Sequence, residues 1–153
     1  TSSAGVRQGQ DVFYLAKIDG REQMSLISSV GRRVPASCTG LGKALLATLS
    51  DDEVRKLYAD APLPILTEHS LRSLDELLAQ LAVARERGYA TEHGESGPHV
   101  SCIAVPILTG DGQALGALSI SLPTSVWETT PEEHWAKLIK DAGHELHESL
   151  AFL

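Results

Sequence analysis

Residues 100–122, VSCIAVPILTGDGQALGALSISL, decide the fold class of this chain. The runs 100–108 and 114–122 are rich in aliphatic and β-branched residues and have the length of strands. Asp111-Gly112, which lies between them, is typical of a tight turn. This stretch therefore predicts an antiparallel β-hairpin.

The two faces of this hairpin differ in the size of their side chains. Because side chains alternate between faces along a strand, Leu118, Ile120 and Leu122 share one face, which suits core packing. The other face carries small and partly polar residues, namely Cys102, Ala104, Ala117, Ser119 and Ser121. Small side chains leave room for a ligand, and two hydroxyl groups can bind a polar one. A solvated outer face, or contact with another helix, is the alternative, and spacing alone favours that alternative.

Helices and strands are mixed along the rest of the chain. Further strands are predicted at 11–18, 24–30 and 89–92, with an irregular connection at 32–37. Helices are predicted at 39–49, 50–59, 73–87 and from 130 onward, with Thr39, Ser50, Ser73 and Thr130 as N-terminal capping residues. Mixed elements around an antiparallel hairpin predict an α+β domain in which helices flank an antiparallel sheet.

The length of 153 residues suits one domain with a single core. The first ten residues are polar, so we expect 1–10 to be a linker or a cloning remnant and 11–153 to form the domain. The chain carries 13 basic and 20 acidic residues, a net charge of −7 with neutral histidines. Since DNA affinity rests on neutralising phosphates, this domain itself is not expected to bind DNA.

The remaining composition points to the cytoplasm. The longest apolar stretches, such as 41–49, are interrupted and too short to cross a bilayer, so no membrane partner is expected. The chain shows no secretory signal pattern. Its two cysteines, Cys38 and Cys102, fit a reducing compartment.

The start of the first long helix is a candidate anion site. Gly40 and Gly42 open this helix, and the first backbone N–H groups of a helix have no acceptor inside it. The run is not a phosphate-binding P-loop, because position 37 is Ser rather than Gly and Lys43 is followed by Ala44. Close packing of the two glycines is the better explanation from spacing alone.

Enzyme motifs are missing from the sequence, since neither GxSxG nor HExxH occurs. Five residues could form a metal or acid–base cluster, namely Glu92, His93, Glu95, His99 and Cys102, but their spacing matches no closed zinc pattern and a solvated loop is simpler. A hydrolase using Cys102 with His93 or His99 stays as an alternative, although no residue to orient the base is evident. We expect a protein that is not an enzyme and that has no metal and no cofactor.

Five segments, in order along the chain, resemble the IclR family of bacterial transcription regulators. They are 31–47 (GRRVPASCTGLGKALLA), 87–90 (RGYA), 100–106 (VSCIAVP), 117–121 (ALSIS) and the amphipathic C-terminal helix. The resemblance extends over 11–153. It implies a C-terminal effector-binding domain with a GAF-like fold. The family joins this domain to an N-terminal winged helix-turn-helix domain, which has no counterpart in this chain.

The resemblance also implies partners and a mechanism. The domain would bind a small organic acid, either a keto acid or an aromatic acid, and would assemble as a homodimer or homotetramer. Its ligand would change the arrangement of the attached helix-turn-helix domains, through which alone the protein contacts DNA. An oligomerisation scaffold without a ligand is the second hypothesis.

Site residues follow from the resemblance position by position. Gly40 and Leu41 would present backbone N–H groups to a ligand carboxylate, Glu92 matches an acidic pocket position, and Val100 would form an apolar wall. Cys102, Ser119 and Ser121 match positions that contact the ligand, and all three belong to the small face of the hairpin.

Two positions depart from the family pattern, and one aromatic residue is left open. Ser37 stands where many members have His, and Leu122 precedes Pro123 where Gly is common. These departures concern the identity of the ligand rather than the fold. Trp127 either closes over a ligand or packs in a subunit interface.

Overall fold

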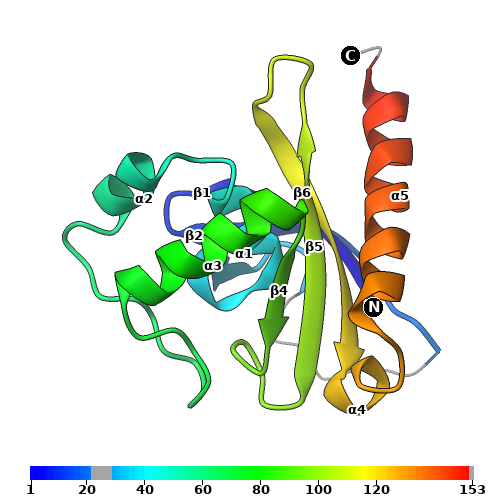
Figure 1. Ribbon diagram of the computed structural model, residues 1–153, viewed down its shortest axis with the longest axis horizontal. Helices are drawn as coiled ribbons and strands as arrows, with labels where there is room; N and C mark the ends of the chain where they lie inside the picture. The colour runs from blue at the N-terminus through cyan, green and yellow to red at the C-terminus, as the bar shows by residue number, and fades with distance from the viewer. Residues whose placement is uncertain (22–28, 152–153) are drawn as a thin grey trace.

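The computed structural model describes residues 1–21 and 29–151. Its elements are β1 Ser2–Gln8, β2 Asp11–Ile18, β3 Arg33–Pro35, the 3-10 turn η1 Ala36–Cys38, α1 Gly40–Leu46, α2 Asp51–Leu57, α3 Leu74–Arg87, β4 Ala90–His93, β5 Val100–Leu108, β6 Ala114–Pro123, α4 Thr124–Trp127 and α5 Glu132–Leu150. The described strands form one six-stranded sheet in the order β3-β2-β1-β6-β5-β4, with antiparallel neighbours throughout (Figure 1). The expected α+β, GAF-like architecture with flanking helices is confirmed.

The N-terminal strand β1 lies inside the sheet, between β2 and β6. Ser3 pairs with Lys17 on one side and with Ser119 on the other, and it is buried. The expectation that residues 1–10 are a linker is therefore wrong. Its polar composition misled the prediction because Ser3 and Gly5 lie where the sheet is closely packed, and such positions select small residues rather than apolar ones.

The connection from β2 to α1 is more regular than expected. Residues 33–35 form β3, which pairs with 11–13 of β2, and 36–38 form a 3-10 turn, so the irregular connection expected at 32–37 is wrong for most of its length. Pro35 is compatible with β3 because this strand is at the edge of the sheet. The strand predicted at 24–30 falls largely on residues 22–28, which lie outside the described residues.

Three of the four expected helix caps are present. The hydroxyl groups of Thr39, Ser50 and Ser73 accept the backbone N–H of the residue three positions on, at 2.9, 3.2 and 3.2 Å. The fourth is wrong: α5 begins after Pro131, with no side-chain cap from Thr130. Since the φ of a proline already suits a helix start, no cap is required to set the direction of the chain.

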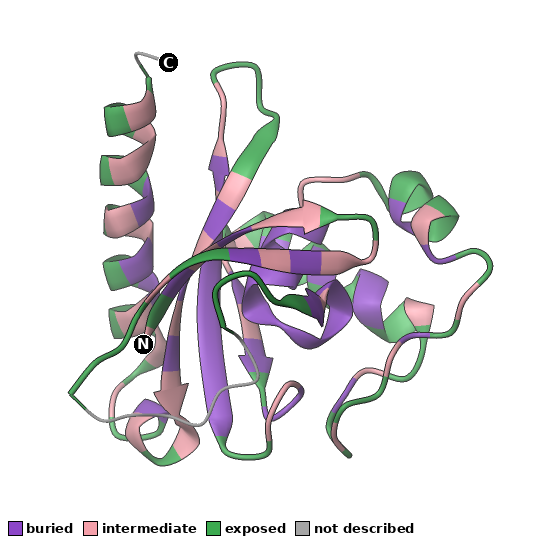
Figure 2. Ribbon diagram, turned by 180° about the vertical axis from the view of Figure 1, so that it is seen from behind, coloured by how far each residue is buried: buried purple, intermediate pink, exposed green. Residues whose placement is uncertain are grey.

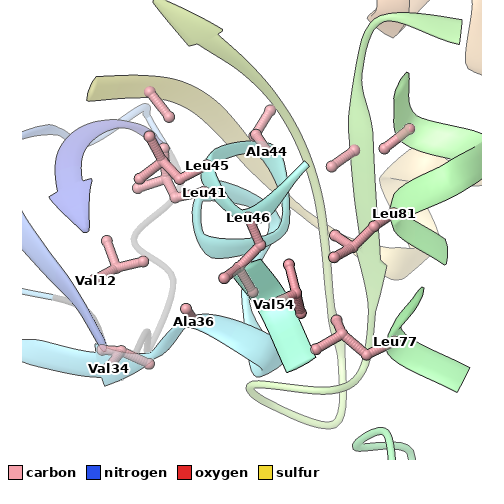
Figure 3. Close-up of a cluster of buried hydrophobic side chains, with 14 of the residues drawn as sticks. Val12, Val34, Ala36, Leu41, Ala44, Leu45, Leu46, Val54, Leu77 and Leu81 are labelled. Carbon is pink, nitrogen blue, oxygen red and sulfur yellow. The ribbon is translucent and has the colours of Figure 1, made fainter. Parts of the chain in front are cut away.

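Helices cover both faces of the sheet (Figures 1 and 2). On one face, α1 and α3 enclose the main apolar core, where Leu41 and Leu46 of α1 meet Val12, Val34 and other side chains (Figure 3). On the other face, α5 packs against the aliphatic side of β5 and β6. The two faces of the hairpin are therefore both buried, which excludes the solvated outer face, and the small face contacts α1.

Candidate functional site

The small face of the hairpin forms a buried polar platform, which we define as Ser3 of β1, Glu92 of β4, Cys102 of β5, and Ser119 and Ser121 of β6. Cross-strand pairing brings them together, because Glu92 pairs with Cys102 and Cys102 pairs with Ser121, while Ser119 pairs with Ser3. None of the five is more than 7% exposed. Buried polar groups cost free energy unless they are partnered, so a cluster of this kind needs a reason other than packing.

Glu92 is the most unusual member of the platform. Its side chain is fully buried, and Oε1 accepts hydrogen bonds from the backbone N–H groups of Glu95 at 2.7 Å and Ser96 at 2.8 Å. The other oxygen, Oε2, is buried without a hydrogen-bond partner among the described residues. Burial raises the pKa of Glu92, and the nearby charge of Glu95 acts in the same direction. Burial therefore shifts the equilibrium of Glu92 toward its neutral form, and a protonated carboxyl group can donate a hydrogen bond.

Cys102 lies between Glu92 and Ser121, with its Sγ 2.9 Å from the hydroxyl oxygen of Ser121. Burial and the neighbouring Glu92 raise the pKa of this thiol well above its ordinary value. Because the thiolate is the reactive form of cysteine, Cys102 is suited to polar contact rather than to nucleophilic attack.

Glu92→Gln is expected to flatten the pH dependence of stability. A raised folded-state pKa means that the favourable contribution is complete below the ordinary pKa of 4.5 and is lost as pH rises through the folded value. Glutamine is neutral at all pH values and keeps the acceptor oxygen. Urea unfolding measures the free energy that each protein loses between pH 5 and pH 8. The variant should lose less than the native protein, by about 1.4 kcal/mol for each unit of pKa shift removed.

The control for this experiment is Glu76→Gln. Backbone N–H groups of Arg72 and Ser73 lower the pKa of that exposed carboxyl group, so in the fold it is not expected to gain a proton between pH 5 and pH 8. Its variant should lose stability between pH 5 and pH 8 as the native protein does. Equal slopes for Glu92→Gln and the native protein would show that Glu92 is ionised in the fold without penalty.

The start of α1 lies directly on the platform. Thr39 caps the helix by accepting the N–H of Gly42, which leaves Gly40 and Leu41 at the first two helical positions, whose N–H groups have no acceptor inside the helix. A Cβ atom on Gly40 would lie 3.2 Å from the Cβ of Cys102, so glycine permits this close approach. The Leu41 side chain points into the main core, so only its backbone faces the site.

All seven residues predicted for the site are buried, and Gly40, Glu92 and Ser121 lie directly beside Cys102. Val100 completes the wall at the first position of β5, two residues before Cys102 and on the same face. Ser3 and Lys43 were missed, and Glu95 was named only as a member of a possible metal or acid–base cluster. Local sequence patterns contain no signal for the burial of Lys43, and the small residues at 3 and 5 become meaningful only once β1 is paired with β6.

Two clefts lie near the platform, and none of the seven residues lines either of them. The larger, of about 690 Å³, is lined by parts of α1, α3, β5 and α5, including Ala44, Val105 and Lys140. The smaller, of about 330 Å³, is lined by residues of α1, α3 and β4, including Lys43 and Gln80. The platform itself is covered by α1, so ligand entry would require α1 or the loop after β4 to move.

His93 and Trp127 lie on the opposite side of the sheet from Cys102. His93 pairs with Ser101, and its Nδ1 lies 3.1 Å from the Ser101 hydroxyl, while its ring meets the Trp127 ring edge-on with centroids 5.1 Å apart. Trp127 is buried in the core beneath α5. This placement separates His93 from Cys102 and argues against a hydrolase that uses this pair, and it removes Trp127 from the predicted pocket.

Within residues 1–21 and 29–151, no group of three or more His, Cys, Asp or Glu side chains is arranged to hold a metal ion. Over the same part of the chain, no helix has the length and apolar character needed to cross a membrane. Glu92 and Glu95 are buried rather than solvated, so the expectation of a solvated loop is wrong for these two acids.

Comparison with known proteins gives the family. The family model described as "Bacterial transcriptional regulator IclR C-terminal" matches residues 1–148. The chain belongs to the IclR family. Over 152 residues it is 31% identical to the HTH-type transcriptional regulator XynR of Escherichia coli, a match that covers 99% of this chain and 60% of XynR.

Solved structures of other proteins share the architecture of this IclR-family domain. The repressor BlcR of Agobacterium tumefaciens is 30% identical with a TM-score of 0.83, over 98% of this chain and 59% of BlcR. An IclR homologue from Microbacterium hydrocarbonoxydans, solved with 4-hydroxybenzoate, is 22% identical with a TM-score of 0.87, over 99% of this chain and 61% of its own, and so shows the fold alone. The chain thus spans about 60% of the length of these relatives.

Proposed function

We propose that this IclR-family domain senses a small organic acid and controls the oligomeric arrangement of an attached helix-turn-helix domain. The observation that carries the proposal is the buried polar platform, in which Glu92 Oε2 has no partner among the described residues. Unpartnered buried polar groups are costly, and a ligand that supplies hydrogen-bonding atoms would remove that cost. The Microbacterium hydrocarbonoxydans homologue was solved with 4-hydroxybenzoate in the same fold, so aromatic acids are tested beside keto acids.

The platform and the start of α1 together suit a carboxylate. The N–H groups of Gly40 and Leu41 would donate to one carboxylate oxygen, and the hydroxyl groups of Ser119 and Ser121 to another. A protonated Glu92 would add a donor rather than a repelling charge, since burial raises its pKa. Val100 would contact the apolar part of the acid. Each of these groups is on the α1 side of the sheet.

Ligand binding would affect the attached helix-turn-helix domains by shifting the equilibrium between two arrangements of the domains. A ligand changes the arrangement of domains only if it binds one arrangement better than another. Because α1 covers the platform, a bound acid and the closed position of α1 compete for the same space near Gly40 and Cys102. We therefore expect displacement of α1 to transmit the effect of ligand binding to a homodimer or homotetramer interface. The net charge of −7 supports DNA contact through the helix-turn-helix domain alone.

Thermal unfolding with a panel of acids, from glyoxylate to 4-hydroxybenzoate, tests this proposal. A specific acid at 100 times its Kd stabilises the folded state by about 2.7 kcal/mol, which for a domain of this size raises Tm by roughly 5 to 10 °C. The double variant Ser119→Ala/Ser121→Ala should lose most of this shift. Lys140→Ala, in the larger cleft, should keep it.

The outcomes separate the candidate functions. A shift lost in Lys140→Ala but kept in the double serine variant would place the ligand in the larger cleft instead of on the platform. A stable dimer with no response to any acid would favour the oligomerisation scaffold. Retention of the full shift in both variants would contradict binding at either place.

A further inference from the structure

Lys43 is a fully buried lysine, with only 1% of its surface exposed. It belongs to the glycine-rich start of α1, but it does not face the platform. Its Nζ donates to Glu95 Oε1 at 2.5 Å, to Gln80 Oε1 at 2.5 Å and to the carbonyl oxygen of Thr91 at 3.3 Å. A lysine ammonium has three donors, and all three have an acceptor. A lysine is rarely buried unless it is paired, so the three acceptors account for the burial of Lys43.

Glu95 connects this lysine to the platform. Its backbone N–H donates to Glu92 Oε1, the same oxygen that accepts from Ser96. Its side chain pairs with Lys43, with side-chain exposures of 7% for Glu95 and 2% for Lys43. Its carbonyl oxygen accepts the Ser70 hydroxyl at 2.8 Å. The turn formed by 92–96 is therefore fixed to α1 at one end and folded around the Glu92 carboxyl group at the other.

We propose that Lys43 and Glu95 are a positioning pair that holds the turn at 92–96 against α1 and so fixes the Glu92 carboxyl group on the platform. The ion-paired side chains make no hydrogen bond to the platform; the pair acts through the backbone N–H groups of Glu95 and Ser96, which donate to Glu92. As far as ligand binding is concerned, this inference rests on the proposed function. The positioning itself is independent of any ligand and can be measured without one.

The energetics of buried ion pairs explain how positioning can be separated from stability. Removing one partner leaves an uncompensated buried charge and destabilises the fold, whereas replacing both by neutral groups of similar volume is often tolerated. The double variant Lys43→Met/Glu95→Gln therefore keeps the fold and removes the ionic link. Glutamine at 95 retains an oxygen that can accept the His93 backbone N–H, as Glu95 Oε2 does at 3.3 Å.

Amide hydrogen exchange on the folded protein tests the pair directly. In the double variant, the amides of Glu95 and Ser96 should exchange at least about tenfold faster, while those of β5 and β6 keep their native rates, because local opening needs less free energy than global unfolding. A ¹³C titration of the Glu92 carboxyl group should show its pKa rise further, because a loosened turn withdraws the Ser96 hydrogen bonds that lower it, whereas loss of the Glu95 charge alone would lower the pKa. A merely structural pair would alter Tm without changing either readout selectively.

Lys137→Met/Asp141→Asn is the matched control, because this ion pair in α5 is exposed and remote from the turn. It should change neither the exchange of the turn amides nor the titration of Glu92. If Lys43→Met/Glu95→Gln fails to fold, Lys43→Gln/Glu95→Gln decides, since it also removes both charges and keeps a donor for Gln80 and Thr91. Native exchange rates at Glu95 and Ser96 in the folded variant would overturn the proposal, whether or not any acid binds the platform.

Discussion

Gly42→Ala is expected to lower the free energy of unfolding by at least about 3 kcal/mol, the upper end of what an overpacked core costs. An added Cβ would lie 2.1 Å from the carbonyl oxygen of Ala36 and 2.3 Å from its Cα. Both atoms belong to the backbone of the 3-10 turn before α1, so no side chain can rotate away. The gain of about 1 kcal/mol that alanine brings over glycine inside a helix is too small to offset this clash.

Urea unfolding monitored by circular dichroism measures this effect. Gly110→Ala is the control, because Gly110 is exposed, and a Cβ there would meet nothing within 4 Å. Its change should stay within about 0.5 kcal/mol. A midpoint for Gly42→Ala that matches the native one would mean that α1 does not approach the turn at 36–38 as closely as described. It would also weaken the argument that the platform is covered.

Local patterns predicted those parts of the fold that depend on neighbours in sequence. The hairpin strands β5 and β6, the caps at Thr39, Ser50 and Ser73, and the division of the hairpin into a large and a small face are present. Each follows from a spacing rule that acts over two to four residues. The small face also placed Cys102, Ser119 and Ser121 together before any strand order was known.

Pairing between distant segments could not be predicted in the same way. β1 reaches β6 across more than 110 positions, and its polar composition gives no sign that it lies inside the sheet. Lys43 meets Glu95 across 52 positions, and neither residue type suggests burial. The sequence therefore indicated which small residues lie together on the hairpin, but not how α1 covers the platform or what holds the turn at 92–96 against it.

Trp127→Ala is expected to lower the free energy of unfolding by about 3–5 kcal/mol, the usual cost of truncating a buried aromatic residue. Only 9% of Trp127 is exposed, and it contacts the cluster that includes Ile103 and Ile139 beneath α5. Its ring stacks on that of Trp135, with centroids 6.3 Å apart. A side chain so buried in one chain has little surface left for a subunit interface, and it lies across the sheet from Cys102.

Chemical unfolding measures how much stability each Trp127 variant loses. The acid-induced change in Tm tests whether Trp127 lies beside the bound ligand. Trp127→Phe is the control, because it keeps an aromatic ring against α5 and should lose less stability than Trp127→Ala. Both variants should retain the Tm increase produced by whichever acid stabilises the native protein, since Trp127 and the platform lie on opposite faces of the sheet. If Trp127→Ala instead keeps native stability but abolishes the response to the acid, the tryptophan closes over the ligand. The binding site would then extend around the end of β6 to the α5 side.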